Sequence, residues 1–404
     1  MMSMSTEKLV PKLRFNGFDD EWKSYKIGDI SKTYSGGTPS TSKKEYYEGD
    51  IPFIKSGEIN NDVTEQHITE DAINNSSAKR VQKGDLLLAL YGATSGEVAI
   101  SKINGAINQA VLKIDNDMDN YFQYNYFLKY KEQITQKYLQ GGQGNLSANI
   151  IKKLEFNFPE LNEQQKISKF LLLIDTKIEL LEKKYETYVD FKKYLMQQIF
   201  AQKLRFDFKG TWNIDKIGNN CEVFGRIGFR GYTVDDLVNK GEGALTIGGK
   251  HISKNFQLDL TDPEYLSLEK YEESPEIKIY NGDVLLVKTA SVGKVCYIEN
   301  LNEKATINPQ LVVFKNIKLN NKFFYYYLTS SLFQKDLHRI KSTTGIPTIT
   351  QKELLNLNII YPSLEEQEKI VSLFSTVDKK IDIIDKTLKD IEIFKKGLLQ
   401  QMFV

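Results

Sequence analysis

The stretch PELNEQQKISKFLLLIDTKIELLEKKYETYVDFKKYLMQQIF, residues 159–200, is a heptad repeat with no proline after its first residue. Apolar residues recur at alternating steps of four and three. The seam positions are Ile167, Leu171, Ile174, Ile178, Leu181, Tyr185, Tyr188, Lys192, Leu195 and Ile199. A 3.5-residue period held for about five heptads predicts a long helix with one apolar stripe. Such a stripe needs a partner helix to cover it in water.

A second copy occupies residues 362–403, from PSLEEQEKI to QQMF. Its seam positions are Ile370, Phe374, Val377, Ile381, Ile384, Leu388, Ile391, Lys395, Leu398 and Met402. Ser363 and Glu366 fit a capping box at its start. The seam lysines, Lys192 and Lys395, are equivalent in the two copies. They either set the register or face a partner, or only extend their charge into solvent from the end of the seam.

The remaining sequence is duplicated as well, with a period of about 200 residues. The paired landmarks are KLRF (12–15, 203–206), Trp22 and Trp212 each followed by KIG, KGDLLLALYGATSGEVAI (83–100) and NGDVLLVKTASVGKVCYI (281–298), INQ (107–109) and INPQ (307–310), and the aromatic runs at 121–128 and 323–328. A period of this length indicates two domains of one type. Short apolar runs between Gly and Asn-Gly predict strand-rich domains with a few helices. The aromatic runs are expected to be core helices more than stacking platforms for bases.

The predicted class is α+β, with two similar strand-rich domains separated by a long antiparallel two-helix coiled coil and related by a pseudo-two-fold axis. The expected boundaries are residues 1–158 and 202–361 for the domains, and 159–201 and 362–404 for the helices. The first helix enters the second domain after a short connection, so the second helix must run back to pair with it. About 38 residues at 1.5 Å each give a rod near 55 Å. The end of the second helix should then lie beside the first KLRF.

Composition narrows the function classes. The 54 basic and 53 acidic residues leave a net charge of +1, so a nucleic-acid ligand would need basic groups sorted onto one face or a partner that supplies phosphate contacts. Two cysteines and three isolated histidines have no metal-ligand spacing. With no apolar stretch of membrane-spanning length and no signal peptide, a cytoplasmic protein is expected.

Several motifs together resemble a known family. KLRF followed by tryptophan, SGGTPS (35–40), IPFIKSGEI (51–59), INQ, GGQGNLS (141–147) and the helix opening P-x-L-x-E-Q-x-K-I are similar to the target-recognition and conserved regions of type I restriction-modification specificity subunits. The resemblance covers essentially the whole chain. The second copy departs from it, with GRIGFRGY (225–232) in place of SGGTPS and GIPTIT (345–350) in place of GQGNLS.

The resemblance implies a subunit without chemistry of its own. Each domain would read one half of a split double-stranded DNA site, and the helices would set the gap. Two adenine-methyltransferase subunits would dock on the helices, and a nuclease-translocase subunit could join the complex. S-adenosylmethionine, and ATP with Mg in the full complex, would be bound by those partners, and this chain would bind no cofactor.

Base readout needs side chains with donors and acceptors on loops that can enter a groove. The DNA-binding candidates are Lys55, Ser56, Asn60, Lys79, Arg80, Tyr91, Gln143, Asn145, Arg226, Arg230, Lys250, His251, Lys254, Lys288, Thr343, Thr344 and Thr348. Arg226, Arg230 and Lys250 are favoured, because they are basic residues among glycines. For partner docking, the helix candidates are Ile167, Ile174, Ile178, Leu181, Lys192, Ile370, Val377, Ile381, Ile384 and Lys395.

Catalytic motifs are absent from the sequence. A DNA methyltransferase would need a glycine-rich cofactor turn and an NPP-type loop, and INPQL at 307–311 is interpreted as a structural turn instead. GKV at 293–295 lacks the residues of a phosphate loop. Two rival functions stay open: a protein scaffold that does not read sequence, which the near-neutral charge would favour, and an enzyme with its own methyltransferase or nuclease activity.

Overall fold

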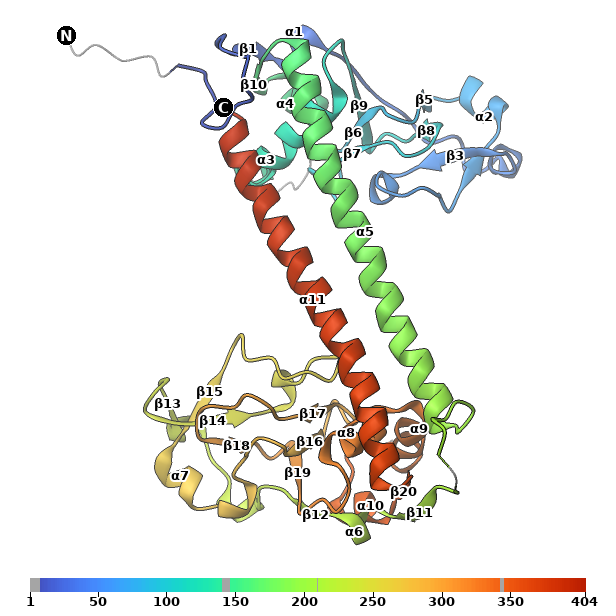
Figure 1. Cartoon of the computed structure of the whole chain (residues 1–404). Helices are drawn as coiled ribbons and strands as arrows, with labels where there is room; N and C mark the ends of the chain where they lie inside the picture. The colour runs from blue at the N-terminus through green and yellow to red at the C-terminus, as the bar shows by residue number, and fades with distance from the viewer. Residues whose placement is uncertain (1–7, 140–145, 209, 342–344) are drawn as a thin grey trace, which may run out of the picture. The chain divides into compact units, whose positions relative to one another are not determined.

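A computed structural model describes residues 8–139, 146–208, 210–341 and 345–404 (Figure 1). The chain divides into two compact units. Unit 1 comprises Met1–Lys183 and Asp385–Val404, and unit 2 comprises Lys184–Ile384. Both boundaries fall inside the long helices α5 (Leu161–Phe200) and α11 (Leu364–Met402), so each unit holds one domain and part of each helix. Within the described ranges, no helix has the length and apolarity needed to cross a bilayer.

The two long helices pair in an antiparallel manner within each unit. In unit 1, Leu171 from the start of α5 shares an apolar core with Leu398 and Met402 from the end of α11. In unit 2, Ile199 from the end of α5 shares a core with Ile370 from the start of α11. The predicted α+β class and antiparallel helix pairing are therefore confirmed.

Domain 1 (residues 23–158) lies in unit 1. Its elements are β1 (Lys23–Lys26), α1 (Ile27–Ile30), β2 (Lys32–Ser35), η1 (Lys44–Tyr47), β3 (Ile51–Ile54), η2 (Ser56–Glu58), β4 (His67–Ile68), α2 (Glu70–Asn74), β5 (Lys79–Val81), β6 (Leu86–Ala89), β7 (Val98–Ile100), β8 (Gly105–Ile107), β9 (Val111–Asp115), α3 (Asn120–Leu139), α4 (Ala148–Lys152) and β10 (Glu155–Phe158). The strands form the sheets β2-β9-β6-β7 and β4-β3-β8-β5 and the pair β1-β10.

Domain 2 (residues 213–361) lies in unit 2 and repeats most of this plan, with a different fourth strand in its second sheet. Its elements are β11 (Asn213–Lys216), α6 (Ile217–Asn220), β12 (Glu222–Phe224), η3 (Gly228–Arg230), η4 (Val234–Asp236), β13 (Leu237–Val238), β14 (Gly243–Ile247), η5 (Gly249–His251), β15 (Glu264–Ser267), α7 (Leu268–Glu272), η6 (Pro275–Ile277), β16 (Val284–Val287), β17 (Val295–Tyr297), β18 (Ala305–Ile307), β19 (Leu311–Lys315), α8 (Asn321–Thr329), α9 (Ser331–Ile340), α10 (Gln351–Asn356) and β20 (Asn358–Tyr361). The sheets are β12-β19-β16-β17 and β13-β15-β14-β18, with the pair β11-β20.

The apolar runs that follow Gly-Asp form central strands buried on both faces. In β6, Leu86 and Leu88 face the core shared with the helices, whereas Leu87 and Ala89 face a second core toward the other sheet. The strand β16 divides its residues between two cores in the same way. Because successive side chains of a strand point to opposite faces, a strand between two cores must be apolar throughout.

The KLRF motif joins each domain to the start of a long helix. Arg14 donates from Nε and Nη2 to the carboxylate of Glu163, with both distances 2.8 Å. Arg205 donates to Glu366 in the same manner, at 3.1 and 2.7 Å. Only half of the predicted capping box forms: the Ser363 hydroxyl accepts from the Glu366 amide, but the Glu366 carboxylate is bound to Arg205 and is not directed back to the cap.

The tryptophan and the QQ(I/M)F ending pack against the aromatic run. In unit 1, Trp22 contacts Phe122 and Phe403, with ring centroids 5.5 and 6.2 Å apart. In unit 2, Trp212 contacts Phe200 and Phe323 at 6.4 and 6.3 Å. The aromatic runs form α8 and the first part of α3, and most of their rings are buried. Their predicted place in the core is confirmed.

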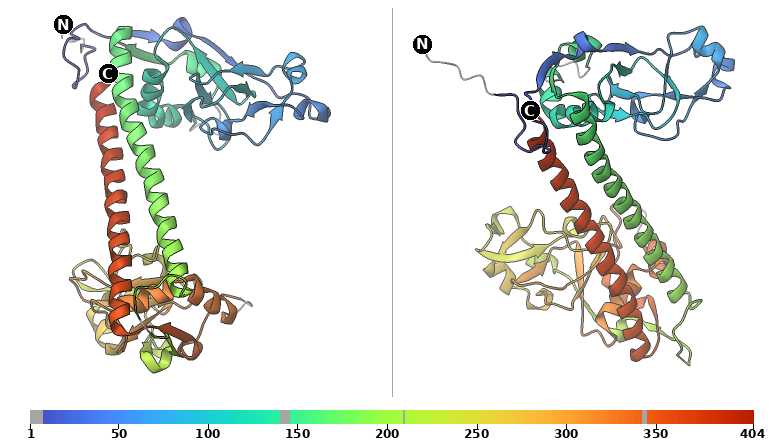
Figure 2. Two further views of the ribbon diagram at one scale, coloured as in Figure 1. Left: turned by 45° about the vertical axis from the view of Figure 1, so that its right-hand side comes forward. Right: turned by 45° about the horizontal axis from the view of Figure 1, so that its top comes forward.

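The end of α11 closes the repeat against the first KLRF. The Leu13 amide donates to the Gln401 carbonyl at 2.9 Å, and the equivalent bond in unit 2 runs from the Leu204 amide to the Gln198 carbonyl at 3.2 Å. In all views, the end of α11 lies beside the segment that precedes β1 (Figures 1 and 2). The predicted position of this helix end is confirmed.

Candidate nucleic-acid interface

Four strands of domain 1 end at one place. The parallel strands β3 and β8 end together, and the Asn108 amide donates to the Ile54 carbonyl. The Gly36 amide, after β2, donates to the Asn108 carbonyl at 3.1 Å, and the Leu90 amide, after β6, donates to the Ala110 carbonyl at 2.8 Å. The segments that follow these strands, residues 36–40, 55–60, 90–96 and 108–110, are called loop edge 1.

Domain 2 assembles an equivalent loop edge 2 from residues 225–232, 248–253, 288–293 and 308–310. The Asn308 amide donates to the Ile247 carbonyl at 2.9 Å, and the Lys288 amide donates to the Gln310 carbonyl at 2.8 Å. Segment 345–350 also joins this edge, because the Ile349 amide donates to the Lys288 carbonyl. Each loop edge thus gathers several sequence-distant segments onto one surface, as a groove-reading site requires.

The segments that follow β2 and β12 pack against their loop edges in different ways. In edge 1, a Cβ added to Gly36 would lie 1.7 Å from the Ile107 carbonyl oxygen, so only glycine permits this approach. In edge 2, the side chain of Arg226 fills the corresponding place, and its Nε donates to the Ile307 carbonyl at 3.2 Å. The substitution of GRIG for SGGT therefore replaces a close backbone contact by a buried arginine.

In domain 2, the favoured candidate Arg226 and a further candidate, His251, are buried and hydrogen-bonded within the domain, which argues against a contact to bases. Arg226 is 6% exposed, and its guanidinium also donates to the Arg230 carbonyl and to Thr306. Burial lowers the pKa of this arginine. His251 is 2% exposed, and its two ring nitrogens contact the Gly248 amide and the Asp262 carbonyl. A contact to DNA would require either side chain to leave hydrogen bonds that hold loop edge 2.

The other favoured cations are ion-paired at the surface. Lys250 lies 2.6 Å from Asp262 and 2.9 Å from Glu264, and hydrogen bonds to these carboxylates raise its pKa. Arg230 lies 3.3 Å from Glu276. Both are exposed enough to exchange a carboxylate for a phosphate. Their role in DNA contact stays a prediction.

The remaining candidates divide by position. Those on a loop edge or beside it are Lys55, Ser56, Asn60, Lys79, Tyr91, Lys288 and Thr348, together with Arg80, which is paired with Glu70. Lys254 is exposed just beyond edge 2. Gln143, Asn145, Thr343 and Thr344 lie outside the described residues. Sequence reasoning missed Thr38 and Gln109, which hydrogen-bond to each other at 2.7 Å across two segments of edge 1.

INPQ and INQ form the same structural turn. The Asn308 side-chain oxygen accepts from the Gln310 amide at 2.9 Å, and Asn108 accepts from the Ala110 amide at 3.0 Å. This Asx turn is a local backbone device. The interpretation of INPQL as a structural turn is confirmed.

The seam residues offered for partner docking are mostly buried inside their own units. Ile167, Ile174, Ile370, Val377, Ile381 and Ile384 are all less than 10% exposed, whereas Ile178, Leu181, Lys192 and Lys395 are partly buried. The opposite face of each helix carries exposed apolar side chains. There, Leu180 and Phe191 of α5 are 62% and 45% exposed, and their repeat equivalents Ile383 and Phe394 of α11 are 65% and 54% exposed. Their signal in the sequence was an apolar pair outside the heptad seam, repeated at the same offset in both copies.

The two units thus carry equivalent loop edges, so the chain presents two similar candidate binding surfaces. The chain belongs to the family of type I restriction modification DNA specificity domains, whose model matches residues 19–187 and 231–393. It therefore acts in DNA sequence specificity within a type I restriction-modification system.

Individual relatives agree with this assignment. The chain is 25% identical to the type I restriction enzyme MjaVIII specificity subunit of Methanocaldococcus jannaschii, over 94% of this chain and 91% of that protein. It is 31% identical to the EcoR124I/EcoR124II specificity subunit of Escherichia coli over 44% of this chain and 49% of that one. The fold matches the crystal structure of the S subunit from M. genitalium with a TM-score of 0.64 and 18% identity, covering 98% and 99% of the two chains.

Proposed function

We propose that this chain reads a bipartite DNA site, with one half-site at each loop edge. The observation that carries the proposal is the duplication of the edge itself, because equivalent strand ends gather equivalent loops in both units. The edges differ in sequence, with SGGTPS in one and GRIGFRGY in the other. Different loops on the same framework are suited to reading two different half-sites. The helices α5 and α11 would set the gap between them.

The balanced charge of the chain fits a reader that works inside a complex. With a net charge of +1 and several edge cations held in ion pairs, the chain alone offers little of the phosphate attraction that supports most DNA binding. Partner subunits would supply much of that attraction. On this proposal the chain is not catalytic, and S-adenosylmethionine, with ATP and Mg in the full complex, is bound by the methyltransferase and nuclease-translocase subunits.

Two methyltransferase subunits are proposed to dock on the outward faces of the helices. Leu180 with Phe394 in unit 1, and Ile383 with Phe191 in unit 2, are exposed apolar pairs related by the repeat. Exposed apolar side chains that recur at the same position suit two copies of one partner. Leu180→Asp should reduce the bound methyltransferase from two copies to one by native mass spectrometry. Leu172→Asp is the matched control, since Leu172 is 49% exposed but its repeat equivalent is the polar Ser375.

A pull-down of the chain with its cognate methyltransferase from a random DNA library tests sequence reading. An enriched sequence in two parts with a constant gap is expected. Failure to enrich any sequence would favour the protein scaffold that does not read DNA. Methyl transfer by the purified chain alone would instead favour the enzyme.

A further inference from the structure

Each long helix carries a lysine in its apolar seam, and both lysines are bound to an aspartate of the other helix. In unit 1, Lys395 of α11 lies 2.5 Å from Asp175 of α5. In unit 2, Lys192 of α5 lies 2.6 Å from Asp378 of α11. The lysine side chains are 14% and 20% exposed. They are therefore not charges extended into solvent, which was one of the two readings open from the sequence.

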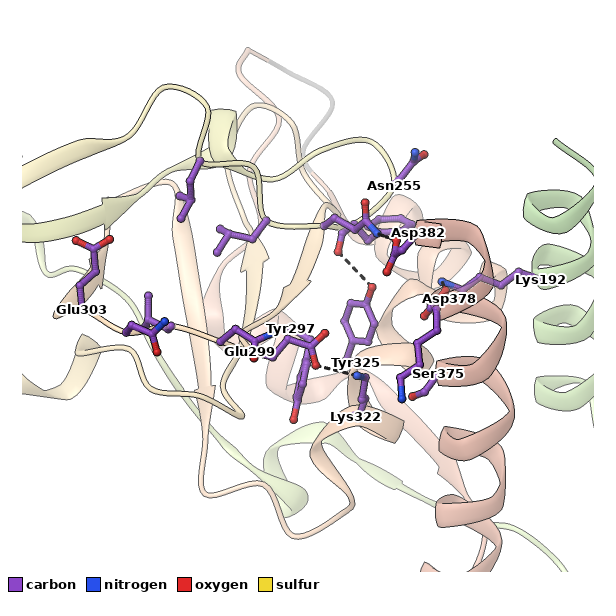
Figure 3. A pocket seen from close by; sticks show the side chains of 18 residues that line it. Lys192, Asn255, Tyr297, Glu299, Glu303, Lys322, Tyr325, Ser375, Asp378 and Asp382 are labelled. Carbon is purple, nitrogen blue, oxygen red and sulfur yellow. Dashed lines mark hydrogen bonds and ion pairs between the residues drawn. The ribbon is translucent and has the colours of Figure 1, made fainter. Parts of the chain in front are cut away.

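A tyrosine from the domain completes each cluster. The Tyr326 hydroxyl of α8 donates to the second oxygen of Asp378 at 2.7 Å, and Lys192 lies over the Tyr326 ring, 5.5 Å from its centre (Figure 3 shows Lys192 and Asp378). In unit 1, the Tyr121 hydroxyl of α3 donates to the second oxygen of Asp175. One carboxylate thus holds three elements together: the first long helix, the second long helix and the aromatic helix of the domain.

The two tyrosines occupy positions that are not equivalent in the repeat. Phe122 aligns with Phe323, because each packs on the tryptophan of its unit. Tyr121 then aligns with Lys322, and Tyr326 aligns with Asn125. The same contact to an equivalent aspartate is therefore made from different positions. If the contact were only a remnant of the duplication, the tyrosine would stand at the same repeat position in both units. Because the positions differ, we take the contact to be functionally important in each unit.

We infer that Asp175 and Asp378 are positioning residues that fix the angle of each domain on the helix pair, and thereby the spacing at which the two half-sites are read. A polar group in an apolar seam specifies one arrangement, because any other leaves the charge without a partner. Since each aspartate binds the opposite helix and the domain at once, its loss releases both. This inference rests on the proposed reading of a split site.

The test measures spacing preference. The full chain, purified with its methyltransferase subunits, selects from a library in which the two half-sites are separated by the native gap or by one or two base pairs more or fewer. Asp378→Asn and Asp175→Asn should each reduce the preference for the native gap about tenfold, the effect of losing a hydrogen-bonded charge. Asp385→Asn is the matched control. Asp385 stands on α11 as well, and Lys389 of its own helix is 2.7 Å away. It should change the preference less than about twofold.

The outcomes separate the two proposals. If the unmodified chain enriches no split site, the proposed function fails. If it enriches one and Asp378→Asn keeps the full gap preference, the positioning role fails, even where the melting temperature has fallen. Should Asp378→Asn not fold, Tyr326→Phe decides, because it keeps the ion pair and removes only the link to the domain. An unchanged gap preference in that variant overturns the inference.

Discussion

The connection between β3 and β4 in domain 1 and that between β14 and β15 in domain 2 occupy equivalent places but end differently. In domain 2, a tight turn around Phe256 reaches the helix pair. Gln257 donates to Asp382 of α11 at 3.0 Å, and the Tyr325 hydroxyl donates to the Phe256 carbonyl at 3.2 Å (Figure 3). In domain 1, the hydrogen bonds described for residues 60–66 stay within the connection or join it to β3, and Val63 is 71% exposed.

This difference shows which parts of a duplicated domain are free to diverge. The sheets β2-β9-β6-β7 and β12-β19-β16-β17, the Arg–Glu contact and the Asx turn are the same in both units, whereas the second sheets share three strands and differ in the fourth, β5 in domain 1 and β13 in domain 2. The connections differ in length and attachment. Phe256 even adopts a left-handed backbone, with φ of 63°, which a non-glycine residue keeps only where surrounding contacts hold it. We therefore expect domain 2 to be held more firmly against the long helices of its own unit than domain 1 is.

The largest contrast between the units is expected at the two buried glutamates. Glu163→Leu should lower the free energy of unfolding by about 3 kcal/mol, because it leaves Arg14 without its charge partner. Glu366→Leu should cost more, since Glu366 also accepts from Trp212 Nε1 at 3.3 Å, whereas Trp22 Nε1 has no partner among the described residues. Chemical denaturation of both variants measures the difference. Equal losses would show that the indole contact contributes nothing.

The next largest effect on stability is expected at the turn around Phe256, which contacts the helix pair. Phe256→Ala should destabilise unit 2 by about 2 kcal/mol through lost packing. Val63→Ala at the equivalent connection should stay within about 0.5 kcal/mol. Hydrogen exchange of the amides of residues 253–258 should rise in the first variant alone. A similar rise for residues 60–66 in the second would mean that domain 1 is braced as well.

Arg226 and Arg230 lie four residues apart, but their loss should affect different properties, stability for Arg226 and DNA binding for Arg230. Arg230→Ala should weaken binding to one half-site about tenfold at physiological salt, and leave stability nearly unchanged. Arg226→Ala should lower the free energy of unfolding by about 1–3 kcal/mol, because buried carbonyls lose their donor. Binding to each half-site and thermal melting are measured for both. Unchanged affinity of Arg230→Ala at low salt would remove Arg230 from the DNA interface.

The smallest effect concerns the two cysteines, both in unit 2. Burial raises the pKa of Cys221 and of Cys296 to about 12. A raised pKa leaves almost no thiolate at pH 8, so neither thiol should react with a disulfide reagent in the folded chain. Both should react in denaturant. Fast reaction of either thiol under native conditions would show that unit 2 opens locally.

The sequence predicted the helices and the duplication because periodicity is a property of the chain itself. It did not show that Arg226 and His251 are buried, because a basic residue among glycines looks the same whether its loop faces solvent or folds onto a strand end. The exposed residues Leu180 and Phe191 were not predicted as docking residues, because the heptad pattern identifies only the seam face of each helix. The partner of Arg14 lies far along the chain, and no local pattern identifies it.

The short strand pairs β1-β10 and β11-β20 have an evolutionary consequence. Tyr25 is paired with Phe156, and Asp215 with Ile359, so the chain enters and leaves each domain through adjacent strands. The segment between such strands could be exchanged as one cassette, provided that its aromatic helix keeps its contacts with the long helices. Recombination within a cassette would then supply new specificities on an old framework, and the companion subunits would need no adjustment.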